Sequence, residues 1–320
     1  MVWLIGCKGM LGSEIARQLD DNSIPWVGTD TDVDITDPLA LEAFASSHDS
    51  TATKTGGAVS KGKTHGKIKW VINCAAFTDV NRAESSEELA TKLNEAGPRN
   101  IARTARQIGA KMIHISTDYV FDGKGSEPYT ETTPKAPLGV YGKTKSLGED
   151  SVQKEMTQYY ILRTAWLYGF DGKNFVYTMT KAMNSNPSVK VVNDQRGTPT
   201  CAIDLAGVII KIIQTSERAT GLFGKNSAIP YGIYHFTNMG DITWFDFAKK
   251  IYELGKKYER ISNTCTVEPC ATSDYPTPAQ RPAYSVLSKE KIQKALKIKI
   301  PEWDESLEKF IKSPRFKSEQ

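Results

Sequence analysis

The stretch that decides the fold is Met1-Val-Trp-Leu-Ile-Gly-Cys-Lys-Gly-Met-Leu-Gly12, at the start of the sequence. Apolar residues of strand type run directly into a turn built on Gly6, Gly9 and Gly12, and apolar residues then recur at helical spacing. Glycines let such a turn approach a ligand closely, and the first turn of the following helix offers free N–H groups and the positive end of its dipole. The stretch therefore predicts a site for the pyrophosphate of a dinucleotide.

The same strand–helix alternation continues through the first half of the chain. We expect strands over residues 1–5, 25–28, 69–74, 111–115 and 159–163, and helices over 10–19, 38–47, 87–107 and 138–153. This order predicts an α/β fold with a Rossmann-like, doubly wound parallel sheet.

After about residue 165 the alternation loosens, and polar loops that contain proline appear at 193–200 and 274–282. Helices are expected over 243–254 and 304–311. We expect a nucleotide-binding domain over 1–165 and a mainly substrate-binding, smaller α/β domain over 166–320, with some later segments returning to the first domain.

Composition narrows the class of protein. The net charge is +4, from 41 basic and 37 acidic residues, which is too balanced to indicate nucleic acid as a partner. The five cysteines lack zinc-ligand spacing, and no apolar run is long enough to span a membrane. We expect a reduced, cytoplasmic protein with no membrane partner. Residues 50–67, rich in Thr, Ser, Gly and Lys, predict a solvated insertion.

A second set of residues predicts acid–base chemistry. Tyr141 and Lys145 are four residues apart, so they share one face of the expected helix. A free tyrosine has a pKa of about 10, and a nearby ammonium group stabilises the phenolate and lowers that pKa. Thr117 follows the expected strand 111–115, at the strand end where open α/β sheets bind ligands. We predict a proton donor, its tuning cation, and a hydroxyl that hydrogen-bonds a substrate carbonyl.

The identity of the dinucleotide stays open. Asp30 closes the second strand, where a carboxylate accepts hydrogen bonds from the adenosine ribose and favours NAD over NADP. Lys8, within the glycine turn, could instead neutralise the 2′-phosphate of NADP. Besides these two residues and the glycines, the predicted cofactor contacts are Met10, Leu11, Asp34, Ile35, Ala75, Ala76, Phe77, Ile115, Tyr141 and Lys145.

Longer motifs accompany the predicted cofactor residues and the predicted acid–base residues. They are Asn73-x-Ala-Ala-Phe-Thr-Asp-Val80, Ser116-Thr-Asp-Tyr-Val-Phe-Asp-Gly123, Val140-Tyr-Gly-Lys-Thr-Lys145, Arg163-Thr-Ala-Trp-Leu-Tyr168, Asn193-Asp-Gln-x-Gly-x-Pro-Thr200 and Pro276-Thr-Pro-Ala-x-Arg-Pro282. The Thr–Tyr–Lys set behind a glycine turn resembles the extended short-chain dehydrogenase/reductase superfamily. The motifs as a whole resemble the dTDP-4-dehydrorhamnose reductase family over almost the whole chain.

The resemblance implies an oxidoreductase with NADPH or NADH as cofactor. The implied reaction reduces the C4 ketone of dTDP-4-dehydro-β-L-rhamnose to dTDP-β-L-rhamnose, in dTDP-rhamnose and cell-surface polysaccharide biosynthesis. Tyr141 would donate the proton, Lys145 would tune it and hold the nicotinamide ribose, and Thr117 would orient the carbonyl. The implied contacts to the dTDP-sugar are Thr117, Asp118, Trp166, Asn174, Phe175 and Arg281, with Arg281 on the diphosphate and Arg196 a weaker second.

Two departures from the family pattern matter. Asn81 stands where many relatives carry an acid. Some relatives form dimers through glutamates that bind Mg²⁺; Glu14 matches one ligand, but the apolar Ile203 occupies another ligand position, and it cannot serve a hard cation. We therefore expect no obligatory metal, and either a monomer or a homodimer.

Three functions remain open at this point. Besides the dTDP-sugar reductase, the fold suits another nucleotide-4-ketosugar reductase, an epimerase or a 4,6-dehydratase. A dehydratase needs a second acid, which Thr117-Asp118-Tyr119 lacks. The third function is a non-catalytic regulatory subunit like the β subunit of methionine adenosyltransferase. The substrate-facing loops at 193–200 and 276–282 favour an enzyme.

Overall fold

A parallel sheet forms the centre of the molecule. The computed structural model describes residues 1–48, 66–219 and 229–317. Within these ranges the strands of a six-stranded sheet lie in the order β10-β5-β4-β3-β1-β2, and every neighbouring pair is parallel. The strands are β1 (Val2–Ile5), β2 (Trp26–Thr29), β3 (Trp70–Asn73), β4 (Lys111–Thr117), β5 (Tyr159–Thr164) and β10 (Gly232–His235). This confirms the predicted parallel α/β sheet.

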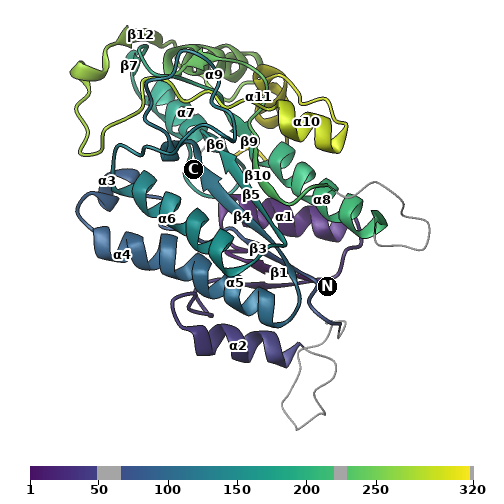
Figure 1. Cartoon of the computed structure of the whole chain (residues 1–320). Helices are drawn as coiled ribbons and strands as arrows, with labels where there is room; N and C mark the ends of the chain where they lie inside the picture. The colour runs from purple at the N-terminus through teal and green to yellow at the C-terminus, as the bar shows by residue number, and fades with distance from the viewer. Residues whose placement is uncertain (49–65, 220–228, 318–320) are drawn as a thin grey trace.

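Helices cover both faces of this sheet (Figure 1). On one face, α1 (Met10–Asp21) packs beside α8 (Ala202–Ala219) and α10 (Glu290–Leu296). On the other face lie α2 (Pro38–Ser47), α5 (Gly97–Gln107) and α6 (Val140–Glu155). Both layers bury continuous apolar clusters against the strands, so the predicted doubly wound arrangement is confirmed.

The helix predicted over 87–107 is present but not uniform. It begins as α4 (Glu87–Thr91), passes through a π-helical turn over Lys92–Ala96, and continues as α5. Asn94, in the π-helical turn, is fully buried and accepts a hydrogen bond from the Phe77 amide at 2.8 Å. A short helix, α3 (Val80–Ala83), was not expected.

The strand order reverses between β1 and β3, because β2 lies on one side of β1 and β3 on the other. Ligands of open α/β sheets bind at such a switch point. The glycine turn lies there: Gly6 has a φ of +77°, and a Cβ on it would lie 2.8 Å from the Ala75 nitrogen. A Cβ on Gly12 would lie 2.0 Å from the Gly6 carbonyl oxygen. Only glycine fits both positions.

The remaining elements form a second, smaller group above the strand ends (Figure 1). Its helices are α7 (Phe175–Ser185), α9 (Trp244–Lys257) and α11 (Trp303–Lys312), and its paired strands are β7 (Ser188–Val192) with β12 (Thr266–Cys270), β6 (Leu167–Tyr168) with β9 (Thr200–Cys201), and β8 (Arg196–Gly197) with β11 (Ile242–Thr243). The helices expected over 243–254 and 304–311 are confirmed as α9 and α11.

Segments of the second half also belong to the main sheet. β10 pairs with β5, and α8 packs on α1. The domain boundary near residue 165 stays a prediction. The expected insertion at 50–67 lies outside the described residues, except for its last two. No helix in the described ranges is both long and apolar enough to cross a membrane.

Candidate active site

A cleft of about 940 Å³ opens at the carboxyl ends of the sheet strands. Most of the residues predicted from the sequence line it together. They are Gly6, Lys8, Gly9, Met10, Leu11, Gly12, Asp30, Asp34, Ile35, Ala75, Ala76, Ile115, Thr117, Asp118, Tyr141, Lys145 and Trp166. The predicted cofactor end and the predicted reactive end are therefore two parts of one cleft.

The cofactor end fits a dinucleotide. Gly9 precedes α1 and provides no side-chain cap, so the first N–H groups of this helix have no side-chain acceptor from their cap. Asp30 lies against the turn, where its carboxylate accepts hydrogen bonds from the amides of Lys8 at 3.1 Å and Thr31 at 3.0 Å. The close approach enforced by Gly6 and Gly12 leaves the space that a pyrophosphate needs.

The reactive end is built by β4 and α6. Lys145 is buried, and its Nζ donates a hydrogen bond to the Ile115 carbonyl at 2.7 Å. Thr117, the last residue of β4, donates its hydroxyl proton to the Asp118 carboxylate at 2.9 Å. Tyr141 sits in the first turn of α6, with the Tyr119 ring edge-on at 5.4 Å.

The start of α6 is capped by Glu84, which directly follows α3. Glu84 accepts a hydrogen bond from the Val140 amide at 3.0 Å, which caps the helix that carries Tyr141. Lys143, two residues after Tyr141, points to the surface and pairs with Glu87 at 3.2 Å. The helix thus presents Tyr141 and Lys145 to the cleft and Lys143 to solvent.

Burial has the largest effect on the pKa values of Tyr141 and Lys145. Burial raises the pKa of Tyr141, Asp118 and Tyr119 raise it further, and the Thr117 hydroxyl opposes them. Burial also lowers the pKa of Lys145 to about 8, with the carboxylate of Glu149 acting against it. The expectation that Lys145 tunes Tyr141 stays a prediction: here the Thr117 hydroxyl lowers the Tyr141 pKa, and the Lys145 ammonium donates to the Ile115 carbonyl.

Asp118 is the second perturbed acid of the cleft. Its side chain is buried, and burial raises its pKa to about 6, while the hydrogen bond from Thr117 opposes that rise. Its Oδ2 has no hydrogen-bond partner among the described residues. A buried carboxylate with a spare acceptor and a raised pKa is typical of a site that receives a ligand.

Trp166, two residues after the end of β5, also lines the cleft. It has a φ of +48°, a left-handed conformation that is unusual for a bulky residue. Its ring stacks on Trp244 with centroids 3.6 Å apart, and Gly197 packs directly against it. Packing from the second half of the chain therefore holds this strained residue in place.

Four predicted contacts lie away from the lining of the cleft: Phe77, Asn174, Phe175 and Arg281. Phe77 is buried in a cluster with Ala83 and Ala90. Asn174 caps α7, accepting from the Tyr177 amide at 3.2 Å, so its side chain serves the fold. Phe175 packs its ring on Trp244 at 4.5 Å. Their roles in ligand binding stay predictions.

Arg281, the predicted diphosphate ligand, lies behind Tyr119 instead of in the lining. Its guanidinium donates to the Tyr119 hydroxyl and to the Asn81 side-chain oxygen, each at 2.8 Å. The weaker candidate Arg196 is paired with Asp241 at 3.0 Å. Arg281 thus contacts two neutral side chains, and Arg196 contacts a carboxylate.

Sequence reasoning missed part of the lining. The additional residues are Thr31, Val33, Cys74, Thr78, Val80, Leu93, Ser116, Tyr119, Thr164, Ala165, Leu167 and Lys173. Most are chain neighbours of residues that were predicted, at the same strand ends. Lys173 is different, because it follows Gly172, whose φ is +76°. A cation in such a turn is a recognisable phosphate contact.

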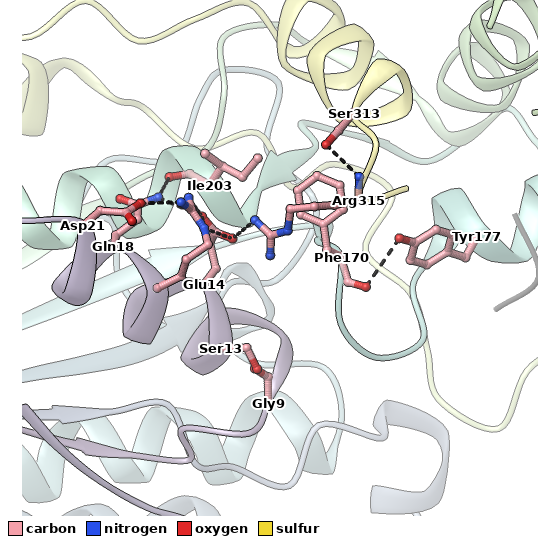
Figure 2. Close-up of polar contacts among 11 residues, drawn as sticks. Gly9, Ser13, Glu14, Gln18, Asp21, Phe170, Tyr177, Ile203, Ser313 and Arg315 are labelled. Atoms are coloured by element: carbon pink, nitrogen blue, oxygen red, sulfur yellow. Dashed lines mark hydrogen bonds and ion pairs between the residues drawn. The ribbon is translucent and has the colours of Figure 1, made fainter. Parts of the chain in front are cut away.

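The residues around Glu14, which matches one metal ligand of some relatives, lie between α1 and the C-terminal segment (Figure 2). Its buried carboxylate accepts from Arg17, from Gln18 at 3.0 Å and from Arg315 at 2.9 Å. Burial alone would raise the Glu14 pKa, but these hydrogen bonds together lower it. Ile203 contributes only its carbonyl, which accepts from Gln18 at 2.9 Å.

These residues do not fit Mg²⁺. Two guanidinium groups already surround the carboxylate, and the described ranges contain no group of three or more His, Cys, Asp or Glu side chains that could hold a metal ion. The expectation of no obligatory metal stays a prediction.

Comparison with known proteins gives one consistent result. The sequence model of the RmlD substrate binding domain matches residues 1–316. A probable dTDP-4,6-dihydroxy-2-methyloxan-3-one 4-ketoreductase of Streptomyces antibioticus is 37% identical over 297 residues, 91% of this chain and 88% of the relative.

Two solved structures extend this similarity. A dTDP-4-dehydrorhamnose reductase of Clostridium acetobutylicum is 39% identical, with a TM-score of 0.83 over 97% of this chain and 98% of its own. The Bacillus anthracis dTDP-4-dehydrorhamnose reductase, solved in complex with NADP, is 33% identical, with a TM-score of 0.82 over 97% of each chain. The chain belongs to the RmlD substrate binding domain family.

Proposed function

We propose that this chain reduces the C4 ketone of dTDP-4-dehydro-β-L-rhamnose to dTDP-β-L-rhamnose, with NADPH or NADH as cofactor, in dTDP-rhamnose and polysaccharide biosynthesis. The observation that carries the proposal is the meeting of the glycine turn with Thr117, Tyr141 and Lys145 in one cleft. Relatives named dTDP-4-dehydrorhamnose reductase, one of them in complex with NADP, support it.

The cofactor would be held by the glycine turn at its pyrophosphate, by Asp30 at its adenosine ribose and by Lys145 at its nicotinamide ribose. When bound, the reduced nicotinamide supplies the hydride that the ketone carbon receives. Asp30 and Lys8 act in opposite directions on a 2′-phosphate, so the preference between NADH and NADPH stays open.

The chain's own residues would manage the proton and the developing charge. Tyr141, kept protonated by its raised pKa, donates its phenolic proton to the alkoxide oxygen. Thr117 hydrogen-bonds the same oxygen and stabilises its negative charge. Lys145, with a pKa of about 8, is still charged at neutral pH and stabilises the phenolate that remains on Tyr141.

The substrate would lie on the Asp118 and Trp166 side of the cleft. Asp118 offers a free acceptor oxygen to a sugar hydroxyl, and Trp166 offers an apolar face. We propose Arg281 as the diphosphate ligand, since its guanidinium contacts a neutral amide and a phenol. Asn174 and Phe175 would act indirectly, through the packing below Trp166.

A related dTDP-4-ketosugar is the second candidate substrate. The Streptomyces antibioticus relative carries the name of a 4-ketoreductase for a different dTDP-sugar, which supports a second dTDP-4-ketosugar as a candidate substrate. A regulatory subunit without catalysis is disfavoured, because the donor, the cation and the hydroxyl are all present. The cytoplasmic location and the monomeric or homodimeric state stay predictions.

One assay tests the proposal. Purified protein is mixed with NADPH or NADH and enzymatically generated dTDP-4-dehydrorhamnose, and cofactor oxidation is followed by absorbance. We expect stoichiometric oxidation and dTDP-rhamnose as product. Tyr141→Phe should lower kcat by about 10²–10⁴-fold and leave cofactor affinity nearly intact. No turnover with either cofactor would refute the proposal, and turnover of the other dTDP-ketosugar alone would select the second candidate.

A further inference from the structure

A buried carboxylate lies directly behind the reactive residues. Tyr141, Lys145 and Glu149 follow one another at four-residue intervals on α6, so they lie along one face of the helix. Glu149 is fully buried. Its carboxylate accepts from Ser116 at 2.6 Å and from two nitrogens of Arg163 at 2.8 and 2.7 Å. These bonds tie α6 to β4 and β5 beside Thr117.

Burying the Glu149–Arg163 ion pair costs free energy, because both charged groups lose their hydration. Both side chains are inaccessible to solvent, and the pair is held in the bidentate geometry that makes such a bond strong. A hydrophobic pair would fill the same space without desolvating two charges. The position therefore indicates a use for the charge itself, beyond packing.

Besides Arg163, a second cation lies beside the Glu149 carboxylate. Lys135, partly exposed, has its Nζ 3.6 Å from the carboxylate. His235 approaches Arg163 at 3.4 Å, but burial lowers its pKa to about 3, so it is uncharged. The remaining titratable groups near this network are Tyr159, whose pKa burial raises, and the carboxylates of Asp150 and Glu131, which accept from Lys135 and from the His235 amide.

Two titratable groups near Lys145 from other elements are neutral. Directly after β3, the Cys74 thiol has a pKa raised by burial to about 12. From β4, burial and Lys145 keep the pKa of His114 well below its ordinary value. Asp118, after β4, is the next carboxylate, but Glu149 is the one that acts on Lys145 in the described part of the chain. Lys145 thus depends on Glu149 for its counter-charge.

We propose that Glu149 is a positioning residue for the reduction, whose carboxylate, fixed by Ser116 and Arg163, holds Lys145 as the charged ammonium beside Tyr141. The inference rests on the proposed function. Removing the charge of Glu149 should make Lys145 lose its proton at lower pH, because Arg163 would then be an uncompensated cation nearby. Removing the charge of Lys135 should act in the opposite direction.

The test compares pH profiles of kcat. Glu149→Gln should move the alkaline limb to lower pH by about two units, as expected for a unit charge about 6 Å away in an effective dielectric constant of about 20. Lys135→Met should move it to higher pH by roughly 0.3 unit, typical of a partly exposed charge. Gln153→Ala, which removes a neutral, exposed side chain that donates to the Glu149 backbone carbonyl, is the matched control and should leave the position of the limb unchanged.

A structural role alone would predict something different. If Glu149→Gln lowered kcat or thermal stability while its alkaline limb stayed in place, the proposal would be overturned. If Glu149→Gln does not fold, Lys135→Met decides. An alkaline limb of Lys135→Met that stays in place or moves to lower pH contradicts the proposed influence of these charges on Lys145. The pH dependence of NADPH affinity, measured by fluorescence, reports Lys145 without any sugar substrate. A shift there with no turnover would overturn the reductase assignment and leave the role of Glu149 supported.

Discussion

Replacing Asp118 by Asn should stabilise the folded protein at neutral pH while impairing turnover. The folded-state pKa of Asp118 is about 6 and its ordinary value is 3.8, so folding favours the protonated form. The resulting cost is absent well below pH 3.8, grows between the two values and is complete above about pH 6. The gap of about two pH units corresponds to about 3 kcal/mol, since one unit is 1.36 kcal/mol.

Asparagine keeps the shape and the acceptor for the Thr117 hydroxyl but carries no charge. Its amide N–H would lie at the Oδ2 position, which has no partner among the described residues, and this costs about 1 kcal/mol at every pH. The net expectation for Asp118→Asn is a gain of about 2 kcal/mol at pH 7 and about zero at pH 4.5.

The measurement is urea unfolding of both proteins, without cofactor, at these two pH values. Asp150→Asn is the control: Asp150 is exposed and makes a surface ion pair with Lys135, so its loss should cost less than about 1 kcal/mol. An Asp118→Asn protein that gains no stability relative to wild type between pH 4.5 and 7 would refute the reasoning. The same variant should raise KM for the dTDP-sugar if Asp118 binds it.

Three further substitutions test the two ends of the cleft. Gly12→Ala should weaken NADPH binding by about 1–3 kcal/mol in a fluorescence titration, because the new Cβ would lie 2.0 Å from the Gly6 carbonyl; unchanged affinity would mean that the turn does not hold the cofactor. Asp30→Ala should move the ratio of kcat/KM values towards NADPH, since it removes a carboxylate that repels a 2′-phosphate; a move towards NADH would contradict the assigned position of the ribose. Arg281→Met should raise KM for the dTDP-sugar about 10- to 100-fold with little change in kcat, and an unchanged KM would remove Arg281 from the diphosphate site.

The parts of the fold and the site that could be predicted are those determined by residues close together in the sequence. The glycine turn and the strand before it are contiguous in sequence, so the predicted pyrophosphate site followed from their order alone. Tyr141 and Lys145 share a helix face by spacing, and Thr117 stands at a strand end. Local geometry was sufficient for these residues because each needs only its own element to be placed.

The parts that could not be predicted depend on contacts between distant segments. Lys145 bonds a carbonyl of β4, and Arg281 meets Asn81 two hundred positions away, so neither partner is visible in the local pattern. The capping role of Asn174 was not predicted, although it is visible locally. An Asn before an apolar helical run is a common N-cap, and that local role explains its position without a ligand.

The place of β10 in the main sheet has a consequence for synthesis of the chain. When the ribosome has completed β5, that strand is still an open edge, and the apolar side of α1 lacks α8. Both are covered only after residues 202–235 have emerged. An exposed sheet edge and an uncovered apolar helix face favour association with other chains. A nascent chain stalled near residue 165 should therefore be a preferred chaperone client, whereas one stalled beyond residue 235 should not.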